Sequence, residues 1–129
     1  MAQIKIYGIT EHLLDVREQL SSVIHQAVID VLGMPADKRA HRFFPMDKDN
    51  LLYPGGRTDA YTIIEIAMIE GRTVDTRKKL IRTLFDRIRA QIGITYQDIE
   101  ITIHESPACN WGFRGIHGDE AQLNYDINV

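Results

Sequence analysis

Hydrophobic positions follow two alternating periods along the chain, and each period predicts one kind of element. Alternation of apolar and polar residues indicates strands, and apolar residues spaced by three and one positions indicate helices with one buried face. In order, the predicted elements are a strand at 3–8, a helix at 11–32, a strand at 39–44, a strand at 62–69, a helix between Thr73 and Gly93, and a strand at 99–104. The order strand, helix, strand therefore occurs twice.

The predicted helix ends carry the residues that commonly start and stop helices. Gly33 and Gly93 follow the last apolar positions of the two stripes, and glycine readily takes the left-handed conformation that ends a helix. Pro35 prevents the first helix from continuing. Thr73 predicts an N-cap for the second helix, with Asp75 suited to the positive end of the helix dipole.

The two halves of the chain match at a fixed offset of sixty residues. The matched pairs are Gly33 with Gly93, Leu20 with Leu80, Ile24 with Leu84, Val28 with Ile88, Ile4 with Ile64, and Ile6 with Ile66. We interpret this match as an internal duplication within a single domain, 1–129. The repeats span about 1–58 and 59–106, and a tail follows at 107–129. The alternative is that two amphipathic units of this kind align by their period alone.

This order of elements predicts an α/β fold. Short connections and right-handed crossovers make the two strands of each half parallel. Two β-α-β repeats then form a four-stranded sheet with two helices on one face. The turn-rich segment at 45–58 is predicted to be a hairpin-like connection with an irregular loop.

The strand at 62–69 predicts that the second face of the sheet is also covered. Its apolar residues point both ways, with Ile64, Ile66 and Met68 on one side and Ile63, Ala67 and Ile69 on the other. A strand that is apolar on both sides is usually buried on both sides. Because the helices cover only one face, we predict a homo-oligomer in which another copy covers the second. The alternative is that the C-terminal tail folds over it.

Composition narrows the function without identifying it. Of 129 residues, 44% are hydrophobic and 26% charged, and the net charge of −3 provides no broad footprint for nucleic acid or an anionic membrane. The single Cys109, the absence of a long apolar run and the absence of a targeting pattern favour a cytoplasmic location. The histidines lack metal-ligand spacing, so neither a metal nor a cofactor is expected. His25 lies off the apolar stripe and is expected to be solvated.

Three short motifs occur in an order that resembles the tautomerase superfamily. They are the turn Gly33-Met34-Pro35-Ala36-Asp37-Lys38-Arg39, the triplet Gly71-Arg72-Thr73, and Asn110-Trp111-Gly112-Phe113 followed by a glycine-rich tail. The resemblance covers nearly the whole chain and is closest to the duplicated, malonate semialdehyde decarboxylase-like members. It implies a homotrimer with sites where the N-terminus meets the sheet and helix edges.

The resemblance also implies catalytic roles for two positions. An arginine at the start of the second helix binds the substrate carboxylate in this family, and Arg72 occupies that place. The family's base is an N-terminal proline exposed by removal of methionine. Here Ala2 follows Met1, so removal of Met1 would leave a primary amine that can accept a proton.

Further candidate site residues depart from the family pattern or follow it loosely. Lys38 aligns with an aspartate of the decarboxylase-like members, and Glu70 aligns with an arginine, which disfavours decarboxylation of a semialdehyde acid. Trp111 and Phe113 are candidate pocket walls, or else interface or core aromatics. Arg114 is a candidate second anion ligand, and Arg39 adds positive charge beside Lys38.

Three function hypotheses remain open. The first is a keto-enol isomerase, or a related enzyme, that acts on small carboxylate-bearing substrates. The second is a non-catalytic oligomer of the same fold that binds a small anion or serves as a scaffold, since the N-terminal proline is replaced by Ala2. The third is a nucleic-acid-binding module using Lys38, Arg39 and Arg42, which the net charge of −3 disfavours.

Overall fold

The computed structural model describes residues 2–129 and has the predicted order of elements. The elements are β1 (Ala2–Ile9), α1 (Thr10–Leu32), β2 (His41–Met46), β3 (Thr62–Ile69), α2 (Val74–Ile92), β4 (Ile99–Ser106), β5 (Gly112–Phe113) and β6 (Ile116–His117). The second strand starts two residues later than predicted, and the small β5–β6 hairpin in the tail was not foreseen. Three short 3-10 turns lie in the connections.

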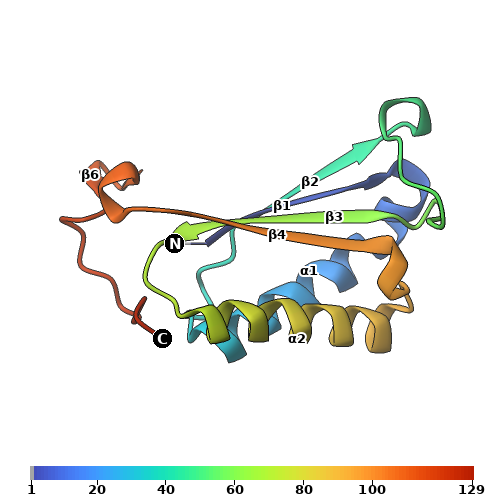
Figure 1. The fold of residues 1–129 in the computed structure, drawn as a ribbon. Helices are drawn as coiled ribbons and strands as arrows, with labels where there is room; N and C mark the ends of the chain where they lie inside the picture. The colour runs from blue at the N-terminus through green and yellow to red at the C-terminus, as the bar shows by residue number, and fades with distance from the viewer. Residues whose placement is uncertain (1) are drawn as a thin grey trace.

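The sheet has the order β2-β1-β3-β4, and both helices lie on one of its faces (Figure 1). β1 pairs in parallel with β2, and β3 pairs in parallel with β4, as right-handed crossovers require. β1 and β3 run antiparallel at the centre, with Lys5 opposite Glu65. Because these two positions are also sixty residues apart, the two β-α-β repeats are related by an approximate two-fold axis at this pair. The predicted fold class is confirmed.

The helix ends follow the predicted chemistry. Thr73 is the N-cap of α2, and its hydroxyl oxygen accepts a hydrogen bond from the Thr76 amide at 3.1 Å. Gly33 and Gly93 end the two helices with φ angles of 68° and 84°. In this left-handed region glycine is favoured over residues that carry a Cβ.

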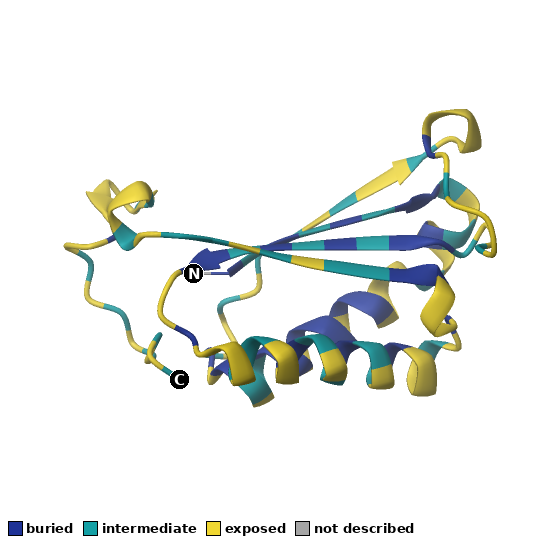
Figure 2. Ribbon diagram, viewed as in Figure 1, coloured by how far each residue is buried: buried dark blue, intermediate teal, exposed yellow. Residues whose placement is uncertain are grey.

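The core lies between the helices and the inner face of the sheet. Figure 2 shows buried positions alternating with half-buried ones along the central strands, while both helices expose their far side. The largest fully buried side chains there include Ile6, Leu20, Ile24, Ile64, Ile66, Leu80, Leu84 and Ile88. These are the apolar positions that the sequence pattern assigns to one face of each helix and strand.

The prediction that His25 is solvated is wrong. His25 is only 5% exposed, and its Nε2 lies 2.8 Å from the carbonyl oxygen of Ala36. The chain that follows α1 folds back beside the helix and covers this position. The spacing of apolar residues along α1 does not predict this burial, because the burial comes from a contact with the loop.

The second face of the sheet is not covered by the tail. The tail runs past the end of the sheet toward the start of α2 (Figure 1), where the Thr73 amide donates to the Val129 carbonyl oxygen at 2.9 Å. Ile63 and Ala67 on the second face are half-buried within one chain. Cover by a second copy therefore stays a prediction.

Candidate functional site

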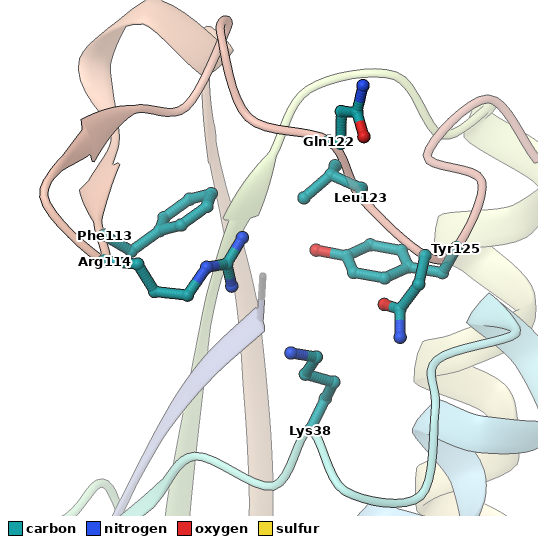
Figure 3. A pocket seen from close by; sticks show the side chains of 7 residues that line it. Lys38, Phe113, Arg114, Gln122, Leu123 and Tyr125 are labelled. Carbon is teal, nitrogen blue, oxygen red and sulfur yellow. The ribbon is translucent and has the colours of Figure 1, made fainter.

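A cavity of about 320 Å³ opens at the end of the sheet where β1 begins (Figure 3). Three segments that are distant in sequence form its walls: the loop between α1 and β2, the turn between β5 and β6, and the tail. The lining residues are Lys38, Phe113, Arg114, Gln122, Leu123, Asn124 and Tyr125. The Ile4 amide donates to the Ala40 carbonyl oxygen at 2.9 Å, which holds the Lys38 loop against the beginning of β1.

Two cationic side chains project into this cavity from different segments. Lys38 comes from the loop before β2 and Arg114 from the β5–β6 turn, and their nitrogen atoms point toward the same space in Figure 3. The guanidinium carbon of Arg114 lies 4.9 Å from the centre of the Phe113 ring. That ring therefore forms part of the wall and also supports the guanidinium group.

The backbone of Arg114 is strained. Its φ angle is 55°, in the left-handed region, and it is the only non-glycine residue with a positive φ in 2–129. Gly115 follows with a φ angle of 78°, so the turn has the two positive φ angles that asparagine and glycine usually provide in such hairpins. An arginine here costs about 1 kcal/mol relative to those residues. Strain of this kind tends to occur at functional sites.

The tail forms the remaining wall, and backbone contacts hold it in place. Besides the bond between Thr73 and Val129, Gly71 lies so close to the tail that an added Cβ would come within 2.8 Å of the Ile127 carbonyl oxygen. Tyr125 is half-buried and packs against the main core. These contacts hold the end of the tail near the cavity that Gln122 and Asn124 line.

Arg72 lies inside the molecule and does not line this cavity. It is 4% exposed, and one guanidinium nitrogen donates to the Ile69 carbonyl oxygen at 3.0 Å. A second nitrogen lies 3.7 Å from the sulfur of Met34, while Nε has no hydrogen-bond partner. Burial lowers the pKa of Arg72, an effect partly offset by the carboxylates of Glu105 and Asp126. The guanidinium group thus connects the end of β3 to the loop that carries Lys38.

The other candidates from the sequence lie around the cavity without lining it. Ala2 is 4% exposed and pairs with Met68 at the beginning of β1, while Met1 lies outside the described residues. Arg39 is exposed and directs a guanidinium nitrogen to the Ser21 hydroxyl at 3.5 Å. The exposed Glu70 donates its backbone amide to the Ser106 carbonyl oxygen at 3.0 Å.

Trp111 is a half-buried residue of the tail. A Cβ on Gly118 would come within 2.8 Å of the Trp111 side chain, and the indole nitrogen is buried without a partner. Of the predicted candidates, the cavity brings together Lys38, Phe113 and Arg114. Sequence reasoning missed Gln122, Leu123 and Asn124, because this segment has neither periodicity nor a motif.

The lining is suited to a small organic anion. Lysine and arginine provide positive charge, two amides provide directional hydrogen bonds, and the aromatic rings with Leu123 provide apolar walls. No carboxylate or histidine is among the described lining residues. Elsewhere in 2–129, no cluster of three potential metal ligands is present, and no helix has the length and apolar character to cross a membrane.

Comparison with known proteins identifies the family of the chain. A family model described as "Tautomerase enzyme" matches residues 38–114, which run from Lys38 through β2, β3, α2 and β4 to Arg114. The probable tautomerase YusQ of Bacillus subtilis (strain 168) is 26% identical over 101 residues, covering 74% of this chain and 80% of that protein. A probable tautomerase of Ralstonia nicotianae is 33% identical over 54 residues, covering 42% of this chain and 77% of that one.

Solved structures share the fold. Native fused 4-OT has a TM-score of 0.81 at 17% identity, covering 91% of this chain and 96% of that chain. Malonate semialdehyde decarboxylase has a TM-score of 0.77 at 17% identity, covering 86% and 89%. At these identities the likeness concerns the fold alone. The fold defines a β-α-β repeat protein of the tautomerase type. Since the family model also matches more than half of the sequence, the chain belongs to the tautomerase family.

Proposed function

We propose that this tautomerase-family protein binds a small carboxylate in the cavity at the start of β1 and interconverts its keto and enol forms. The observation that carries the proposal is the convergence of Lys38 and Arg114 on one cavity beside the N-terminal strand. Two cations can hold one carboxylate, and Phe113 with Leu123 can contact the apolar remainder of the molecule.

The amine of Ala2, freed by removal of Met1, is the proposed base. Ala2 is held at the beginning of β1 by its pairing with Met68, at the end of the sheet where the cavity lies. The amine would take a proton from the carbon beside the substrate's carbonyl group and return it to the enol oxygen, so no atom is gained or lost. Arg72 contributes a buried positive charge near the same end.

We also propose that the chain is a cytoplasmic homo-oligomer, most simply a trimer. The second sheet face carries half-buried apolar residues within one chain, Ile63 and Ala67 among them. Fused 4-OT proteins with the same fold are trimers. In such an oligomer, any functional role would lie at the interfaces between copies for Arg39, Glu70 and Trp111.

The second candidate function is binding without catalysis. It is favoured by the lining itself, in which the described residues comprise two cations, two amides, apolar groups and Tyr125 but no carboxylate or imidazole. In that case the protein would hold a small anion through Lys38 and Arg114, and the Ala2 amine would have no chemical role.

The test uses phenylpyruvate, an aryl keto acid that also has an enol form, and protein whose N-terminus is verified by mass spectrometry. We expect Met1-free protein to accelerate ketonisation and protein that retains Met1 to be inactive. Lys38→Met should weaken phenylpyruvate binding roughly tenfold, while Lys79→Met, at an exposed position of α2, should have no effect. Binding without turnover by the Met1-free protein would favour the second candidate. No binding by any form would contradict both.

A further inference from the structure

The loop between α1 and β2 carries Lys38, and few contacts fix its shape. The loop begins after Gly33, with Met34 buried against Arg72, and it ends where the Ala40 carbonyl oxygen accepts from the Ile4 amide. Between these two anchors, the Lys38 amide donates to the Pro35 carbonyl oxygen at 3.0 Å, which closes a tight turn. That hydrogen bond lies within the turn and does not connect the turn to the rest of the protein.

His25 makes that connection. It lies in the middle of α1, is 5% exposed, and its Nε2 lies 2.8 Å from the Ala36 carbonyl oxygen. A carbonyl oxygen only accepts hydrogen bonds, so the proton resides on Nε2 and Nδ1 is unprotonated in the neutral ring. Nδ1 is buried without a partner. The ring's polar contact is therefore directed at the loop, two residues before Lys38.

The location of this bond matters because a lysine side chain is a flexible four-carbon stem. Its ammonium group can occupy a defined place in the cavity only if the backbone that carries it is fixed. Without the His25 bond, the turn would be held at Met34 and Ala40, on either side of Lys38, and otherwise by the side chain of Arg39, whose guanidinium nitrogen lies 3.5 Å from the Ser21 hydroxyl. Ala36 is exposed, so its carbonyl oxygen could then bond to water, and the turn could move without leaving a buried polar group unpaired.

We propose that His25 is a positioning residue for Lys38: it fixes the turn from which the lysine reaches the bound carboxylate. The imidazole does not touch the ligand, and it acts through the Ala36 carbonyl oxygen. This inference rests on the proposed ligand role of Lys38. It gives a function to a buried histidine that the apolar stripe of α1 leaves unexplained.

Two substitutions at His25 separate positioning from general packing. His25→Leu fills similar space without a donor, whereas His25→Gln keeps an N–H donor at nearly the same reach. We expect His25→Leu to speed hydrogen exchange of the Lys38 amide and to raise the dissociation constant for phenylpyruvate roughly tenfold. His25→Gln should restore most of both. His12→Leu is the matched control, since His12 is a partly buried histidine near the start of α1, away from this loop.

A double-mutant cycle with Lys38→Met completes the test. If His25 acts through Lys38, His25→Leu should cause no further loss of binding once the lysine is absent. If His25→Leu weakened phenylpyruvate binding equally in the wild type and in Lys38→Met, His25 would have a general structural role and the proposal would be overturned. The proposal would also be overturned if His25→Leu changed neither the hydrogen exchange of the Lys38 amide nor binding, even if Lys38→Met alone weakened binding. If Lys38→Met left binding unaffected, the ligand role of Lys38 would fail, while faster exchange in His25→Leu would still support a loop-fixing role.

Discussion

The two ends of the sheet are built from equivalent positions of the two repeats, yet they differ in chemistry. Lys38 and Asp98 lie sixty residues apart, each just before the second strand of its repeat. Lys38 faces the cavity. Asp98 is 3% exposed, and its two carboxylate oxygens accept from the Thr58 amide and the Thr58 hydroxyl, both at 2.7 Å. At one end the Lys38 ammonium group is available to a ligand. At the other end the Asp98 carboxylate is hydrogen-bonded within the protein.

The connection between the repeats explains the difference. The chain from β2 to β3 loops over the end of the molecule opposite the tail (Figure 1), and a small apolar cluster of Ile9, Leu51 and Tyr61 forms there. Thr58 belongs to the same connection and holds Asp98. The two-fold symmetry of the repeats therefore gives the two ends a similar framework. The connection from β2 to β3 seals one end, and the tail forms a wall of the cavity at the other.

The two repeats also differ in the polarity of three matched positions. The first repeat has Ser21, His25 and His41, where the positions sixty residues later are Ile81, Phe85 and Ile101. The Ser21 hydroxyl lies 2.8 Å from Nδ1 of His41, and the His25 and His41 rings lie 6.1 Å apart. Phe85 and Ile101 pack against the main core instead. The half that carries the Lys38 loop is thus polar where the other half is apolar.

The largest effect on stability is expected at the sealed end. Asp98→Ala removes the acceptor for two Thr58 donors in a buried place, and we expect the free energy of unfolding to fall by about 3 kcal/mol. Asp98→Asn keeps one acceptor oxygen and should cost about 1 kcal/mol. Urea denaturation measures both, and phenylpyruvate binding should not change in either variant.

The matched substitution at the open end is Lys38→Ala. Because Lys38 makes no side-chain hydrogen bond or ion pair to the described residues, its loss should change the free energy of unfolding by less than about 0.5 kcal/mol. If the two substitutions were equally destabilising, the contrast between a sealed and an open end would be wrong.

The polar cluster of the first repeat predicts a loss of stability in acid. Burial lowers the pKa of His41 from 6.5 to about 4, and the nearby charges of His25 and Arg39 add to this effect. The folded protein therefore binds fewer protons than the unfolded chain between these values, so stability is complete above pH 6.5 and is lost as the pH falls toward 4. We expect a loss of about 2 kcal/mol, allowing for solvent screening of a half-buried ring.

Urea denaturation of the wild type and of His41→Asn, from pH 7 to pH 4, measures this loss. The asparagine can still bond to Ser21 but does not titrate, so the slope with pH should become shallower. His117→Asn, at an exposed position of β6, should keep the wild-type slope. An unchanged slope in His41→Asn would mean that other groups cause the acid sensitivity.

The fold followed closely from the sequence, and the reason lies in its repeated local signals. Thr73, Gly33 and Gly93 mark helix ends by backbone chemistry that depends on near neighbours. The strand at 62–69 was predicted to the residue, because Ile64, Ile66 and Met68 face the core that its pattern implies. The second strand was displaced because its burial pattern does not alternate cleanly.

The cavity could be predicted only in part. Lys38, Phe113 and Arg114 stood out through charge, aromaticity or resemblance, whereas Gln122, Leu123 and Asn124 reach the cavity only because distant contacts at Gly71 and Thr73 hold the tail. Arg72 was expected to be available to an anion, but its guanidinium group is turned inward to Ile69 and Met34. Such placements depend on long-range packing, which no local pattern encodes.

The sharpest test of the open end concerns the strained turn, where the expected change in stability is small. Asparagine adopts the left-handed conformation of Arg114 more easily, so Arg114→Asn should raise the free energy of unfolding by about 0.5 kcal/mol. The same change removes one of the two cations from the cavity and should weaken phenylpyruvate binding roughly tenfold. Arg17→Gln, at an exposed position of α1, should alter neither quantity.

A gain in stability together with a loss of binding would show that the strain at Arg114 is retained for the ligand. Such opposite signs are typical of functional positions, where the residue best for the backbone differs from the residue the site needs. Asp98 at the sealed end should show the other behaviour, because its substitution lowers stability and leaves binding intact. If Arg114→Asn were stabilising without any effect on binding, the turn would have no part in ligand recognition, and Lys38 would be left as the only cationic ligand lining the cavity among residues 2–129.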